Sequence, residues 1–197
     1  MRQLPTRAEG NRTKTPDYAE QPPVASGLLR MCLPVTNRLY FLTALFSLAV
    51  LAKGSVVINE IYYKPADKTL PEEFIEICNR NPSTVNLSGW RFSQGIEYTF
   101  PEGTILEAGG YLVLAENPAT LQTAFSTAAL GPYSGRLAND GEKLVLRDRQ
   151  DEVVDEVEYG GEFPWPVEVG NGGSIELIHP ALDNSLGGSW RTSTDVT

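Results

Sequence analysis

The stretch from Glu73 to Trp90 constrains the fold of this chain more than any other part of its sequence. It begins with Glu73-Phe74-Ile75-Glu76-Ile77, where apolar and polar residues alternate with the period of a strand that has one buried face. A polar turn follows at Asn81-Pro82-Ser83, because proline and asparagine interrupt strand pairing and favour turns. The chain then returns to a tryptophan, whose large apolar body suits a small core. Four of its side chains are predicted to form part of the core of a β-sandwich: Ile75, Ile77, Leu87 and Trp90.

The chain after residue 55 repeats this pattern of short β-prone runs separated by Gly, Pro, Asn and Asp. Regularly spaced runs of this kind are typical of a sandwich or barrel. Further strands are predicted at 55–63, 91–93, 97–100, 111–115, 143–147, 152–159 and 174–178. In the run 152–159, Val153, Val157 and Tyr159 are predicted to share a face. One short helix is predicted at 118–129, where two apolar residues lie four positions apart.

Charge divides the chain near residue 55. The first 54 residues contain 7 of its 16 basic residues and 3 of its 25 acidic ones, so the remainder contains 9 basic and 22 acidic residues. Affinity for nucleic acid rests largely on Lys and Arg side chains that displace counterions from phosphates. Nucleic acid is therefore not an expected partner of the acidic part.

The N-terminal region has the features of an export signal. Residues 39–52 are fourteen uncharged, mainly apolar residues after Arg38. A membrane-spanning helix needs about 20 apolar residues, so this length suits the apolar region of a secretory signal better. We expect residues 31–54 to be a signal peptide, or alternatively an uncleaved anchor that would be the chain's one contact with a membrane. Residues 1–30 are expected to be a disordered extension or a wrongly assigned gene start, with Met31 as the true start.

A series of short motifs runs in order between Val56 and Trp190. It includes Ile58-Asn59-Glu60-Ile61, Glu73-Phe74-Ile75-Glu76-Ile77, Asn86-Leu87-Ser88-Gly89-Trp90, Leu137-Ala138-Asn139-Asp140-Gly141-Glu142, Gly173-Ser174-Ile175-Glu176-Leu177 and Ser189-Trp190. Together these motifs closely resemble the lamin tail domain in its bacterial, exported form. The resemblance implies an all-β, immunoglobulin-like β-sandwich over residues 55–197, preceded by the signal or anchor segment. It also implies a module without catalytic residues or cofactors.

From this resemblance we expect an exported, non-catalytic module that binds a protein or a cell-envelope component, or acts as a scaffold. Its expected location is the extracellular space, the cell surface or the periplasm. One alternative is an accessory domain of a larger secreted enzyme truncated at Thr197. Another is a calcium-dependent adhesion module.

The residues that could carry catalysis are few. The single histidine, His179, follows the last predicted strand and precedes a proline, so a surface position is expected. Nucleophilic catalysis of the Ser-His-Asp or Cys-His kind requires a base beside the nucleophile, and no such motif is present. Cys78 lies on a predicted strand and is expected to act as a small buried hydrophobic residue.

Acidic and aromatic residues supply the remaining candidates. Glu60, Glu73 and Glu76 are interpreted as solvent-facing strand residues, with Arg91 as a cross-strand partner. The alternative for these carboxylates is a weak calcium site, since Ca²⁺ prefers carboxylate oxygens; no metal ligand is assigned. Trp165, which lies between two prolines in a predicted loop, is the one candidate for ligand contact, by stacking on a carbohydrate.

Overall fold

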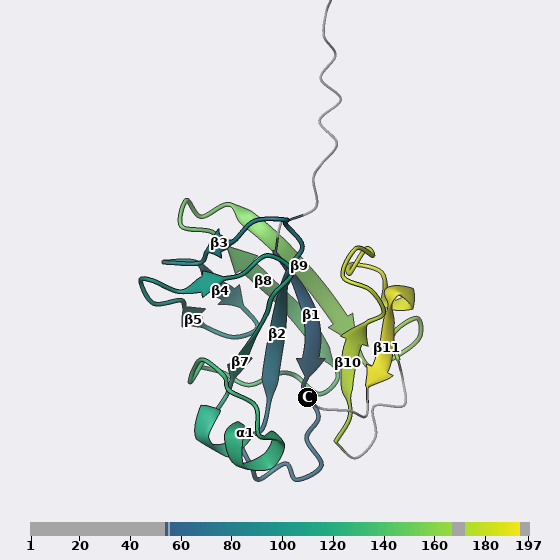
Figure 1. Cartoon of the computed structure of the whole chain (residues 1–197). Helices are drawn as coiled ribbons and strands as arrows, with labels where there is room; N and C mark the ends of the chain where they lie inside the picture. The colour runs from purple at the N-terminus through teal and green to yellow at the C-terminus, as the bar shows by residue number, and fades with distance from the viewer. Residues whose placement is uncertain (1–53, 55, 167–171, 194–197) are drawn as a thin grey trace, which may run out of the picture. The chain divides into compact units, whose positions relative to one another are not determined.

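The computed structural model describes residue 54 and residues 56–166 and 172–193 (Figure 1). These residues belong to one compact unit, Ser47–Thr197. The predictions for residues 1–30 and for the signal or anchor segment up to residue 53 lie outside the described residues. Within the described part of the chain, no helix combines the length and the apolar character that crossing a membrane requires.

The described residues form two main antiparallel sheets (Figure 1). The five-stranded sheet has the order β11 (Trp190–Ser193), β10 (Ser174–Leu177), β1 (Val56–Tyr62), β2 (Phe74–Asn79) and β7 (Tyr111–Ala115). The four-stranded sheet has the order β5 (Tyr98–Thr99), β4 (Arg91–Gln94), β8 (Gly141–Arg147) and β9 (Val153–Gly160). A separate pair is formed by β3 (Val85–Asn86) and β6 (Ile105–Leu106). The two helical segments are α1 (Pro118–Phe125) and the 3-10 turn η1 (Gly187–Ser189).

The core lies between the two main sheets. Ile61 pairs with Ile175 on one side and Ile75 on the other, so the five-stranded sheet presents a row of buried isoleucines to the core. The four-stranded sheet contributes side chains such as Leu146 and Val157 to the same cluster. Ile75, Ile77 and Leu87 are fully or almost fully buried there, and Trp90 is partly buried and packs against the cluster. Burial of this continuous apolar layer is the main force that holds the sandwich together.

Polar contacts fix the turn that follows β2. The buried Asn79 side chain donates hydrogen bonds from Nδ2 to the carbonyl oxygens of Ser83, Leu106 and Glu107 at 2.9, 3.1 and 2.9 Å. Further along, Gly89 has a φ of +73°, a conformation that glycine adopts without steric cost. The stretch from Glu73 to Trp90 is thus held by its own side chains and glycine, as a structural element of the sandwich.

A partly buried carboxylate joins the two sheets near the N-terminal end of β1. Asp155, on β9, accepts hydrogen bonds from the Ile58 amide at 2.8 Å and from Asn184 Nδ2 at 2.7 Å. Burial is the largest influence on this carboxyl group and raises its pKa to about 6, against the opposing effect of these two hydrogen bonds. Trp190 Nε1 in turn donates to the backbone carbonyl of Asn184 at 2.9 Å, so Asn184 is held through its side-chain amide and its main chain. This network fixes the segment between β10 and β11 against the sandwich.

The outer face of the five-stranded sheet, which points away from the core, is covered at one end by α1 (Figure 1). The helix is capped by Asn117, whose Oδ1 accepts from the amides of Ala119 and Thr120 at 3.0 and 3.2 Å. Leu121 is buried against Tyr62, Phe74 and Ala115 of β1, β2 and β7. Tyr62 and Phe74 stack with ring centroids 5.2 Å apart.

Several predicted elements differ from the structure. The helix ends at Phe125 and not at residue 129, because Ser126 adopts a left-handed conformation with φ of +58°. The prediction that Val153 shares a face with Val157 and Tyr159 is wrong: a register irregularity near Arg147 lies opposite Val153, which is 46% exposed while the other two are buried. The short strands β3 and β6 and the C-terminal β11 were not predicted.

Candidate functional site

A β-bulge in β1 places two neighbouring polar residues on the outer face of the five-stranded sheet. The pairing of β1 with β2 shifts between Ile58 and Glu60, so that Ile58 pairs with Ile77 and Glu60 with Glu76. The core-facing residues of β1 are accordingly Ile58 and Ile61, three positions apart where a regular strand has two. The extra residue is Asn59, whose Nδ2 donates to Glu76 Oε1 at 2.9 Å.

The same outer face carries a row of carboxylates across three neighbouring strands. Glu60 pairs directly with Glu176 of β10 on one side and with Glu76 of β2 on the other. The row continues to β11, where Arg191 pairs with Glu176 and contacts its carboxylate at 3.2 to 3.3 Å. Like charges directly opposite one another in a sheet are destabilising. The row therefore works against the stability of the fold.

Burial changes the pKa of the carboxyl group at the centre of the row. Glu60 is only 6% exposed, and burial raises the pKa of its carboxyl group to about 7. A hydrogen bond from Ser174 Oγ opposes this shift, while the charges of Glu76 and Glu176 add to it. Burial also raises the pKa of Glu76 above its ordinary value. The Glu60 carboxyl group thus carries less negative charge near neutral pH than an exposed glutamate does.

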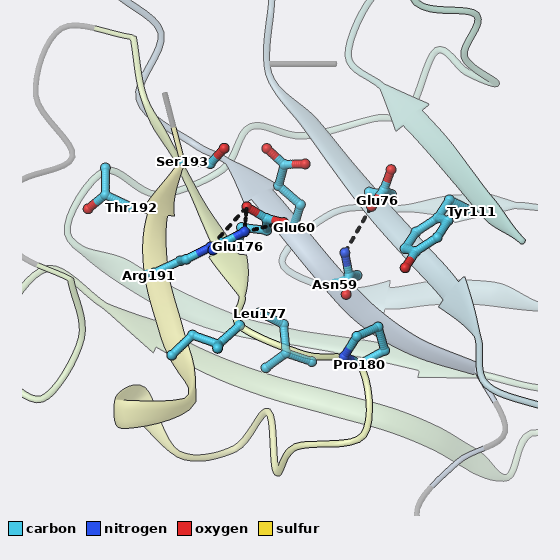
Figure 2. A pocket seen from close by; sticks show the side chains of 11 residues that line it. Asn59, Glu60, Glu76, Tyr111, Glu176, Leu177, Pro180, Arg191, Thr192 and Ser193 are labelled. Atoms are coloured by element: carbon cyan, nitrogen blue, oxygen red, sulfur yellow. Dashed lines mark hydrogen bonds and ion pairs between the residues drawn. The ribbon is translucent and has the colours of Figure 1, made fainter. Parts of the chain in front are cut away.

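The carboxylate row lines a hollow of about 600 Å³ on the outer face (Figure 2). We call it the acidic hollow; its lining comprises Asn59, Glu60, Glu76, Tyr111, Glu176, Leu177, Ile178, Pro180, Arg191, Thr192 and Ser193. Figure 2 shows Asn59 linked to Glu76 on one side of the hollow and Arg191 linked to Glu176 on the other. The hollow combines acceptor oxygens with a partly apolar wall.

One polar atom of the acidic hollow is buried without a hydrogen bond. Asn59 is 5% exposed, and its Oδ1 has no hydrogen-bond partner among the described residues. The bond from Nδ2 to the Glu76 carboxylate fixes the orientation of the amide, since the reverse orientation would place two oxygens together. A buried acceptor left unpaired costs about 1–3 kcal/mol. The unpaired Oδ1 of Asn59 is therefore a local cost to the stability of the fold.

The acidic residues singled out in the sequence do not behave alike. The interpretation of Glu60 and Glu73 as solvent-facing is wrong, because they are 6% and 4% exposed. Glu73 Oε2 accepts from the Leu137 amide at 2.8 Å and holds the segment between α1 and β8. Glu73 is therefore not part of the carboxylate row. Arg91 is not their cross-strand partner: it pairs with Asp151 in a hairpin loop of the other sheet.

The other candidates lie outside the acidic hollow. Trp165 is partly buried and packs on Trp190, with ring centroids 5.7 Å apart, so its role in ligand contact stays a prediction. His179 is exposed, as expected. Cys78 is a buried free thiol, which agrees with the predicted hydrophobic role.

Sequence reasoning missed most of the lining of the acidic hollow, including Asn59, Glu176 and Arg191. Two of these three lie more than a hundred residues from β1, and only the strand order brings them beside Glu60. Asn59 did leave a signal, because Ile58-Asn59-Glu60-Ile61 has two polar residues between two apolar ones and breaks the strict alternation. In the described residues no group of three or more His, Cys, Asp or Glu side chains is arranged to hold a metal ion.

Comparison with known proteins identifies the family. The model of the lamin tail domain family matches residues 49–161, more than half of the 197 residues. A search of curated proteins finds no match. Asn59, Glu60 and Glu76 lie inside the matched range, whereas β10 and β11 follow it. The antiparallel sandwich agrees with the immunoglobulin-like fold of this family, and the chain belongs to the lamin tail domain family.

Proposed function

We propose that this protein is an exported, non-catalytic binding module that attaches to a protein of the cell envelope or the extracellular space through the acidic hollow. The family is one of immunoglobulin-like domains and is consistent with a role in binding. The segment 31–54, with its apolar run after Arg38, supports export.

One observation carries the choice of the acidic hollow as the binding face. Three glutamates occupy adjacent cross-strand positions although their mutual repulsion destabilises the fold. Asn59 Oδ1 beside them lacks a donor. Groups that are unfavourable for folding are often found where function requires them. A partner that supplies positive charge and hydrogen-bond donors would relieve both costs.

A capture experiment tests this proposal. The full chain is immobilised and exposed to the envelope fraction of its native cells, in parallel with a variant that carries Glu60→Gln and Glu76→Gln. A control variant, Glu158→Gln, removes one negative charge from an exposed position of β9. We expect proteins that are retained by the wild type and the control but released by the double variant.

Two results would contradict the proposal. The acidic hollow would be excluded as the binding face if the double variant retained the same proteins as the wild type. Export would be excluded if the protein of native cells were found in the cytoplasm with the segment 39–52 intact, as determined by fractionation and mass spectrometry.

A further inference from the structure

We propose that the acidic hollow binds a primary alkylammonium group, supplied by a lysine side chain of the partner, with its nitrogen between Glu60, Glu76 and Asn59. This inference rests on the proposed function and names the chemical group that the binding face recognises.

The balance of charge in the acidic hollow favours a cation. Arg191 is engaged by Glu176, with three nitrogen–oxygen contacts of 3.2 to 3.3 Å. Among the described residues, no Lys or Arg forms an ion pair with Glu60 or Glu76. The carboxyl groups of Glu60 and Glu76 are therefore available to form an ion pair with a positively charged ligand.

The number of acceptors suits an ammonium group. An alkylammonium has three N–H donors and no acceptor. Glu60 and Glu76 line the hollow, each with a second carboxylate oxygen beyond the one that accepts from Ser174 or Asn59, and the buried, unpaired Oδ1 of Asn59 is a third acceptor. One ligand nitrogen would thus neutralise the row and supply the donor that Asn59 lacks.

The same contacts disfavour a guanidinium group. Arginine is recognised best by a carboxylate that offers both oxygens in a planar, bidentate pair. Here Glu76 Oε1 already accepts from Asn59 and Glu60 Oε1 from Ser174, so each carboxylate has one oxygen left. A compact point charge fits single oxygens from separate groups better.

A bound metal ion also fits less well than an ammonium group. Glu60, Glu76 and Glu176 are not arranged as a group that could hold a metal ion. Calcium requires oxygens at about 2.3–2.6 Å, whereas hydrogen bonds from an ammonium span about 2.7–3.2 Å. The arrangement of the carboxylates therefore favours an organic cation over a metal ion.

The wall of the acidic hollow suits the alkyl part of a lysine. Tyr111 and Ile178 are 54% and 49% exposed and line the hollow with Leu177 and Pro180. The methylene chain of a lysine packs readily on apolar surface while its charged end stays in polar surroundings. These side chains would cover the stem once the nitrogen has reached the carboxylates.

The test follows the side-chain amide of Asn59 by NMR in the full chain during titration with Nα-acetyl-lysine methylamide. We expect a saturable shift of this signal, and at least tenfold weaker binding of the Nε-acetylated compound and of the arginine analogue. The Glu76→Gln variant should bind lysine methylamide at least tenfold more weakly, while Glu158→Gln should bind it like the wild type. Backbone amide spectra establish that each variant is folded. Equal binding of the Nε-acetylated compound, or none by the wild type, would overturn the inference.

Two further arms separate this inference from the proposed function. In the capture experiment, lysine methylamide should release the retained proteins and its Nε-acetylated form should not. If the retained proteins depend on the acidic hollow but lysine methylamide neither binds nor releases them, the inference fails and the proposed function stands. If lysine methylamide binds but no protein is retained through the hollow, the proposed function fails.

Tenfold tighter binding of 1,5-diaminopentane than of lysine methylamide would assign a free amine as the ligand and overturn the protein lysine as its source.

Discussion

Two halves of one sheet face differ in how the chain covers them. At one end of the five-stranded sheet, Tyr62, Phe74 and Ala115 are buried beneath Leu121 of α1. At the next outward positions of β1 and β2 are Glu60 and Glu76, which line the acidic hollow. The chain supplies its own apolar cover for the first half, while charge and an unpaired oxygen mark the second.

This difference separates structure from function on one surface. The covered half gains free energy from apolar burial, as any core does. The acidic half places like charges side by side, and its middle residue, Glu60, is buried. Both features oppose folding. We infer that the first half serves the stability of the domain and that the second serves recognition.

The largest expected effect is on the covered half. Leu121→Ala removes the side chain that packs on Tyr62 and Phe74 and leaves a cavity. We expect a loss of about 2–4 kcal/mol in the free energy of unfolding, measured by urea denaturation. Gln122→Ala, at an exposed position of the same helix, is the matched control and should change stability by less than about 0.5 kcal/mol. A loss in the control as large as in Leu121→Ala would show that burial of Leu121 is not the cause, because neither substitution lowers helix propensity.

The next effect is a gain of stability on the acidic half. Burial raises the pKa of Glu60 from 4.5 to about 7, so the folded protein keeps a proton that the unfolded chain releases between these values. The stabilising contribution of this group is complete below pH 4.5 and is lost as the pH rises through about 7. Glu60→Gln keeps the shape without the ionisation, and should be more stable than the wild type by about 1–3 kcal/mol at pH 8. At pH 4.5 the two proteins should unfold at nearly the same urea concentration, and a variant that was less stable at pH 8 would refute this explanation.

A smaller effect concerns the coupling within the row. Glu76→Gln removes a negative charge that contributes to the raised pKa of Glu60. The pKa of Glu60, followed by the ¹³C signal of its carboxyl group, should fall below about 7 but stay above 4.5, because burial is the larger cause. The control Glu158→Gln should leave it unchanged. No response to Glu76→Gln would mean that the two carboxyl groups do not interact.

The smallest effect is expected for the exposed end of the row. Arg191 is 58% exposed, and its ion pair with Glu176 should contribute at most about 1 kcal/mol to stability. Thermal unfolding of Arg191→Ala should therefore differ little from the wild type. Its binding of lysine methylamide should be stronger, since the variant lacks a cation that competes for the row. Weaker binding would instead give Arg191 a direct part in holding the ligand.

Much of the fold follows from short-range sequence patterns. The strand at 111–115 is found at the predicted residues, because a compact apolar run between Gly110 and Glu116-Asn117-Pro118 fixes both its type and its ends. The alternation at Ile75 and Ile77 similarly identifies the core face of β2. The two-residue strands β3 and β6 escaped prediction because they are too short for any periodicity. The C-terminal β11 escaped because its place is set by pairing with β10.

The candidate site was less accessible to sequence reasoning. Glu60 and Glu76 were singled out from the sequence, and the pairing of β1 with β2 places them directly opposite one another. Their burial and the addition of Glu176 depend on strand order and on the bulge at Asn59, which are properties of the assembled sheet. Local alternation predicts which face a residue occupies, but it does not reveal whether that face is hollowed.

The pKa of the Glu60 carboxyl group with and without lysine methylamide tests the central claim most directly. Its ¹³C signal in the full chain would be followed between pH 4 and pH 9 under both conditions. The claim predicts a pKa of about 7 for the free protein and a lower value with the ligand, because a neighbouring ammonium group stabilises the carboxylate. An identical pKa under both conditions, at a ligand concentration that saturates any shift elsewhere in the protein, would contradict it.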